Sequence, residues 1–319
     1  MKTKIVLFVI CSLVICNLQF AQNITNTLGT SGVFKIKDES TEYLSLNQSN
    51  GQLSISRTIL LLNTISSTTG VVYKGPDRFL HDYQGTGTDG FNTFLGQKSG
   101  NFTLGGSIFY EASNNTGVGY RSLSSLTSGF GNSGLGYNAL LFNTTGYYNS
   151  AFGYSALERN TTGTYNSAYG YHAMISNTTG SENTSVGSSS MLRNNNGTQN
   201  TAVGYNALYQ NVSGWNNTAV GHHSLLNNTG NYNTALGHNS GSTITTGANL
   251  TCIGIDANPS SPTVNDQVTL GNIFVTSLRC NVQTITSLSD ARDKKNISEL
   301  SLGLDFITKL HPRQFNWDK

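Results

Sequence analysis

One row of side chains recurs at a spacing that suits binding. An aromatic residue or histidine directly follows a repeated glycine at seven positions: Tyr120, Tyr137, Tyr154, Tyr171, Tyr205, His222 and His238. Aromatic rings stack well on flat partners, so an exposed row would suit a glycan or another surface. The alternative is a packing ladder or a seam between chains, and we favour that alternative.

Other chemistry in this region is weakly indicated. His222, His223 and His238 could approach a metal, but no carboxylate or cysteine accompanies them. Calcium-binding repeats need aspartates, which these segments almost lack. We therefore expect no metal and no cofactor. Threonine pairs at 144–145, 161–162 and 178–179 would suit an ice-binding array, but they fade in later segments.

The composition favours a β-rich extracellular protein. Charged residues make up 11% of the 319 residues, against about 25% in ordinary soluble domains. The 35 glycines accompany only 4 prolines, which excludes collagen and proline-rich linkers. The net charge of +2 includes Lys2 and Lys4, so the chain without them is neutral. Neutrality argues against nucleic-acid binding.

The N-terminus has the pattern of a signal peptide. Lys2 and Lys4 precede the apolar run Ile5–Ile15, and Ala21 offers a cleavage site. Residues 1–21 are predicted to be removed, which predicts a secreted or cell-surface protein with no membrane span left. Lipidation at Cys16 is the alternative, disfavoured by the bulky Ile15 before it.

Two cysteines remain after that cleavage. Cys252 and Cys280 would lie in an oxidising compartment, where they could pair. Two thiols make no disulfide framework, and sequence leaves the pairing open.

A 17-residue repeat organises the middle of the chain. The glycines that follow a small-apolar pair are 17 residues apart, except for 16 between the seventh and the eighth: Gly119, Gly136, Gly153, Gly170, Gly187, Gly204, Gly221, Gly237 and Gly254. Asparagines stand four residues before most of them: Asn115, Asn132, Asn149, Asn166, Asn183, Asn200, Asn217 and Asn233. Several columns in register over nine copies predict a repeat architecture.

The period is too short for helical repeats, so we expect a β-solenoid with one unit per coil. Each unit offers two strand-like pieces, such as 201–203 and 206–209, between Gly and Asn turns. Stacked asparagines can satisfy backbone groups at the turns. Nine coils at about 4.8 Å make a rod of roughly 43 Å. A single thread of coils buries little, so chains could pool their cores.

The coil type Asn200–Leu208 resembles the left-handed β-roll heads of trimeric autotransporter adhesins, which have somewhat shorter coils. The resemblance covers residues 113–258 and implies a homotrimeric fibre. No amphipathic barrel strands follow, so membrane anchoring by that family's route is not implied.

The flanks of the repeats differ in pattern. Residues 22–112 show alternating segments around Asn50-Gly51, a hairpin signal, and predict an N-terminal β-region. Residues 86–112 could be irregular first coils. Residues 259–288 begin with prolines, where a strand ladder can end. We interpret them as a neck.

The composition shifts after Thr286, where charged residues crowd a short stretch. Asn296 can cap a helix with Glu299 three residues on, and an apolar face follows at helical spacing until Pro312. The sequence thus predicts a short C-terminal α segment. A solvated polar face before that helix is the plain interpretation of the charges.

The strings 289–297 and 310–317 resemble the start of the endosialidase-type intramolecular chaperone domain, and 268–289 resembles the neck before it. That family trimerises β-fibres and then cuts itself away. The resemblance implies Ser289 as nucleophile and Lys294 as general base, in a Ser–Lys dyad of at most one turnover. It reaches about half of the family's domain, so a truncated sequence, a degenerate chaperone and a non-cutting remnant stay open.

Together these patterns predict an all-β, trimeric β-solenoid of 17-residue coils, with residues 289–319 as a partial chaperone domain. The leading hypothesis is a secreted or surface-displayed fibre or adhesin whose partners are its own copies and a glycan or cell surface. The alternatives are a self-cleaving serine peptidase and an ice- or surface-binding solenoid.

Overall fold

The computed structural model describes residues 33–37, 42–47, 52–55, 63–64, 66–67 and 69–279, and every regular element within them is a β-strand. Strands β1 (Val33–Lys37), β2 (Glu42–Asn47) and β3 (Gln52–Ile55) form a small antiparallel sheet in that order. The Asn47–Gln52 pair joins β2 to β3, as the predicted hairpin requires.

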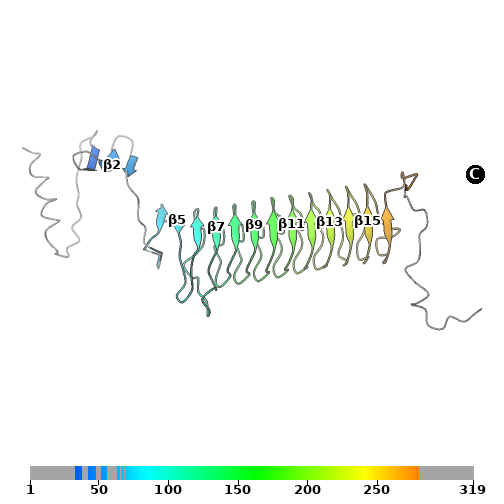
Figure 1. The fold of residues 1–319 in the computed structure, drawn as a ribbon, viewed down its shortest axis with the longest axis horizontal. Coiled ribbons are helices and arrows are strands. Elements are labelled where there is room, and N and C mark those ends of the chain that lie inside the picture. Colours follow the sequence, from blue (N-terminus) through cyan, green and yellow to red (C-terminus); the bar gives the residue numbers. More distant parts are fainter. Residues whose placement is uncertain are drawn as a thin grey trace, which may run out of the picture.

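A 13-stranded sheet follows, in which sequence order is spatial order (Figure 1). Strands β4 (Val72–Lys74) and β5 (Asp77–His81) pair antiparallel, and so do β5 and β6. From β6 onward every pairing is parallel. The parallel strands are β6 (Thr93–Leu95), β7 (Thr116–Val118), β8 (Ser133–Leu135), β9 (Ser150–Phe152), β10 (Ser167–Tyr169), β11 (Thr184–Val186), β12 (Thr201–Val203), β13 (Thr218–Val220), β14 (Thr234–Leu236), β15 (Thr251–Ile253) and β16 (Val268–Leu270).

The predicted fold class is confirmed as an all-β solenoid of about nine 17-residue coils. Strands repeat in register, so Ala202 of β12 lies between Ser185 and Ala219 of the adjoining strands. No helix occurs among the described residues. The parallel ladder includes one strand before and one strand after residues 113–258.

Each strand is short because only three residues per coil are extended. The middle residue of β6 to β15 is buried, and the residues on either side face outward or are half-buried. Period-two alternation produces this pattern. A small inner residue fits where the coil is thin, and β12 is an example with the buried Ala202.

The prediction of a second strand-like piece at 206–209 is wrong. Asn206 and Leu208 have φ of 54° and 52°, in the left-handed region, so 206–209 turns rather than extends. That conformation costs roughly 1–2 kcal/mol for an L-residue. Burial of the whole Leu208 side chain contributes about 1.5–3 kcal/mol in return. Its N–H also donates to Ser224 O in the next coil (3.0 Å).

Asparagine ladders hold the coils together. A first ladder starts at Asn92, which accepts at Oδ1, and continues through the predicted row. In it each Nδ2 donates to Oδ1 of the ladder asparagine in the previous coil: Asn115, Asn132, Asn149, Asn166, Asn183, Asn200 and Asn217. The last predicted member, Asn233, donates its Nδ2 to Asn228 Oδ1 instead. A second ladder, not predicted, runs through the other turn of each coil: Asn143, Asn160, Asn177, Asn194 and Asn211. It stops at the 16-residue coil, where Asn211 Oδ1 has no partner.

Candidate functional site

The aromatic and histidine row stacks along the rod. Ring centroids are 4.8–5.4 Å apart, at interplanar angles of 4–26°, in the pairs Tyr120–Tyr137, Tyr137–Tyr154, Tyr154–Tyr171, Tyr205–His222 and His222–His238. Ser188 stands at the same repeat position and interrupts the row. Each ring covers a face of its neighbour, so the stack offers a ligand mainly ring edges. A role in surface binding stays a prediction.

Histidines end this row and lie close together. The His222 ring centroid is 3.9 Å from that of His223 and 5.0 Å from that of His238. Burial, followed by the charges of His222 and His238, lowers the pKa of His223, while a hydrogen bond with Asn239 opposes that shift. Within residues 69–279 and the shorter described stretches, no group of three or more His, Cys, Asp or Glu could hold a metal ion.

A row of exposed and half-buried apolar side chains, which we name the apolar column, runs along the outer face of the parallel sheet. It consists of the last residue of each strand from β6 to β16: Leu95, Val118, Leu135, Phe152, Tyr169, Val186, Val203, Val220, Leu236, Ile253 and Leu270. Val203 is 37% exposed and Leu236 51%. A long apolar row at the surface is a candidate interaction site. The repeat places one of these residues directly before each repeated glycine, but the sequence pattern does not reveal that their side chains face outward.

The threonine pairs are only partly available to solvent. Thr144 Oγ1 donates to Thr161 O (3.1 Å), and Thr161 Oγ1 donates to Thr178 O (2.9 Å). The first hydroxyl of each of these pairs therefore links neighbouring coils. Such bonds leave half of the row for an ice-like contact, which weakens that alternative.

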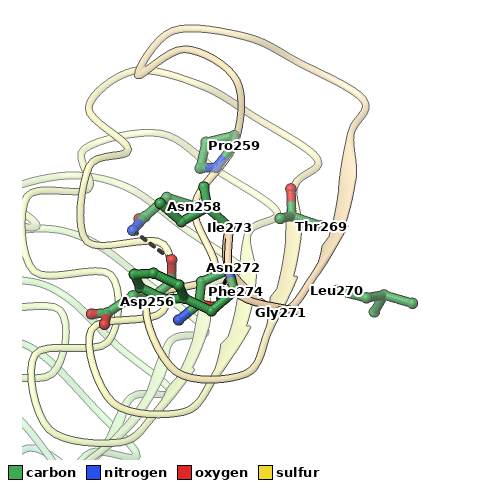
Figure 2. Close-up of a pocket in the computed structure, with 9 residues that line it drawn as sticks. All are labelled: Asp256, Asn258, Pro259, Thr269, Leu270, Gly271, Asn272, Ile273 and Phe274. Atoms are coloured by element: carbon green, nitrogen blue, oxygen red, sulfur yellow. Dashed lines mark hydrogen bonds between the residues drawn. The ribbon is translucent and has the colours of Figure 1, made fainter. Parts of the chain in front are cut away.

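A shallow hollow of about 660 Å³ lies at the C-terminal end of the stack (Figure 2). Asp256 is the single titratable side chain among its lining residues. Ile273 and Phe274 form an apolar wall, 92% and 80% exposed. Asn258 Nδ2 donates to Asp256 O (3.1 Å), which links two of the lining residues. The lining thus places no second acid or base beside the Asp256 carboxylate.

Several predicted features lie outside the described residues: the signal peptide 1–21, the C-terminal α segment, Ser289, Lys294 and Cys280. The Ser–Lys dyad and the domain limits stay predictions. Cys252 is a free, buried thiol at the middle, inward-facing position of β15, and burial raises its pKa.

Comparisons of the chain with protein-family models, curated proteins and solved structures found no match. A search of the described residues found no helix of the length and apolarity needed to cross a membrane. The fold is compatible with a fibre or adhesin-like structural role, so the function has to be argued from the surfaces of the solenoid.

Proposed function

We propose that this protein is a secreted or surface-displayed homotrimeric fibre that acts as an adhesin. The observation that carries the proposal is the apolar column, which runs unbroken from β6 to β16 on a rod of stacked coils. The likeness of the repeats to trimeric adhesin heads, stated above, supports the same assembly.

The strength of this contact would grow with the number of coils. Full burial of a Val or Leu side chain contributes about 1.5–3 kcal/mol, so covering the half-exposed members of the column contributes roughly 1 kcal/mol per coil. A single coil could not offset the association cost of about 4–15 kcal/mol, but a full rod could. A column one residue wide also suits three chains that meet around a common axis, which is a closed cyclic arrangement.

Light scattering on the full chain tests the assembly. We expect a mass three times that of one chain for the wild type. Val186→Asp/Val203→Asp places charges in the apolar column of adjoining strands and should shift the mass toward that of a monomer. Asn196→Asp/Val212→Asp adds the same charge at two exposed positions outside the column and should leave the mass unchanged. A monomeric wild type, or a trimer that tolerates the column charges, would refute the proposal.

A further inference from the structure

Six aromatic side chains cluster near the N-terminal end of the parallel stack, and none of them belongs to the aromatic and histidine row or to the apolar column. We name them the aromatic patch: Phe109, Tyr110, Phe130, Tyr147, Tyr148 and Tyr165. Tyr148 and Tyr165 are 50% and 52% exposed, and Phe109 is 63% exposed. All of these except Phe109 line a shallow hollow of about 720 Å³.

The rings of the patch meet at steep angles. Phe130 and Tyr147 stack at 4.8 Å and 4°, whereas Tyr148 stands at 79° to Phe130 and Tyr165 at 82° to Tyr147. Two walls therefore form a corner. Rings in the aromatic and histidine row cover one another, but rings at a corner leave faces open to a ligand.

The backbone under the patch is unusual for aromatic residues. Tyr148 and Tyr165 have φ of 53° and 57°. Other coils place Asn216 and Asn249 at this repeat position, with φ of 55° each, and asparagine accepts the left-handed region far more readily than tyrosine. Stability alone would favour asparagine, so an exposed tyrosine held there points to a function.

The polar lining of the hollow carries no positive charge. It consists of Glu111, Ser128 and Thr145 besides the tyrosine hydroxyls. Ser107 N donates to Glu111 Oε2 (2.5 Å), which fixes the carboxylate at the rim. A carboxylate with no Lys, Arg or His in the same lining disfavours an anionic partner.

The repeat positions of Tyr147 and Tyr148 continue the surface along the rod. Two coils beyond Tyr148, its position is occupied by Glu182, and one coil later by Gln199. Gln199 Nε2 donates to Glu182 Oε2 (3.0 Å). Further on, Trp215 and Tyr232 pair at 4.3 Å and 70°. The line from Phe130 to Tyr232 spans six coil steps, or roughly 30 Å at about 4.8 Å per coil.

We infer that the aromatic patch and this polar line bind an uncharged polysaccharide chain that lies along the rod. A pyranose ring has an apolar C–H face for the open aromatic faces and hydroxyls for Glu182, Gln199 and the tyrosine hydroxyls. Ligand sites commonly combine aromatic walls with a few polar groups in this way. The inference deepens the proposed function, because it assigns the surface by which the fibre would adhere.

Titration calorimetry of the full chain with cellohexaose, chitohexaose and mannohexaose tests the inference. We expect the wild type to bind at least one of them. Tyr148→Asn/Tyr165→Asn should weaken that binding on the order of tenfold, as for the loss of central aromatic contacts. These substitutions introduce the residue that other coils already hold at this position. Phe142→Gln is the matched control, because Phe142 is exposed outside the hollow and Gln210 stands at its repeat position.

A wild type that binds none of the three sugars overturns the inference, and so does a double variant with unchanged affinity. A double variant that changes the mass in light scattering identifies the patch as a contact between chains and also overturns it. Binding by a monomeric wild type refutes the trimer alone, whereas a trimer without sugar binding refutes the polysaccharide site alone.

Discussion

Replacing Asn166 by alanine removes one rung of the first asparagine ladder. The buried Asn166 side chain makes four hydrogen bonds: Nδ2 donates to Asn149 Oδ1 (3.1 Å) and Gly180 O (2.8 Å), and Oδ1 accepts from N and Nδ2 of Asn183 (both 3.1 Å). Each contributes about 1 kcal/mol net, and a buried group left unpaired costs about 1–3 kcal/mol.

The bonds that remain set the size of the effect. In the variant, Asn149 Oδ1 would keep the N–H of residue 166, and Gly180 O would keep Asn177 Nδ2. Asn183 Nδ2 would keep Gly197 O, so its backbone N–H is the group that loses its partner. We therefore expect Asn166→Ala to lower the free energy of unfolding by about 5 kcal/mol.

Urea unfolding of the full chain, followed by far-UV circular dichroism, measures this loss. Asn196→Ala is the matched control, because Asn196 is exposed and lies outside both ladders, and it should change stability by less than about 0.5 kcal/mol. Repeat proteins can unfold in parts, so amide exchange should also locate the loss in the coils around Asn166. A change in Asn166→Ala as small as in the control would refute the view that the ladder stabilises the stack.

Three further perturbations test the interior. Gly170 has φ of 140°, and a Cβ there would lie 2.6 Å from a carbonyl of the next coil, so Gly170→Ala should cost about 3 kcal/mol or more in thermal unfolding; Gly105→Ala, with open space around it, should not. Burial lowers the pKa of His81 from 6.5 to about 4, so the neutral side chain stabilises the fold fully above pH 6.5. The free energy of unfolding should fall by about 3 kcal/mol as pH falls from 6.5 to about 4. Urea titrations at several pH values should show this slope, and His81→Gln should flatten it. Burial also raises the pKa of Cys252, so in a Cys280→Ser chain iodoacetamide should label it only after unfolding, and rapid labelling of the native protein would contradict its placement in the core.

The inner positions were predictable because coil stacking constrains them twice. Every inner side chain meets the coil before and the coil after, so Ala202 and Leu208 recur as small and large apolar residues at fixed spacing. The period alone thus predicts the solenoid, strand β12 and the first asparagine ladder.

The outer surfaces were not predictable in the same way. Val203 faces outward because Ala202 is the central, buried residue of the strand. The left-handed turns at Asn206 and Leu208 decide which residue is central. The aromatic patch was missed for a related reason, since Phe130 and Tyr147 touch only because they stand 17 residues apart in adjoining coils. Aligning every position of the repeat, and not only those near the glycine, would have found it.

Function in such a rod belongs to the positions that differ between coils. A change at an inward-facing strand residue such as Ala202, or in the asparagine ladder, disturbs contacts with two neighbouring coils at once. This keeps those positions uniform. The positions of Tyr148, Glu182 and Gln199 face solvent, so a change there breaks no contact inside the stack, and only the left-handed backbone distinguishes one side chain from another in folding energy. They can therefore shift from aromatic to acidic to amide along one line while the backbone stays the same. A ligand that spans several coils would read that order of side chains, which is why an extended chain suits this surface better than a small molecule.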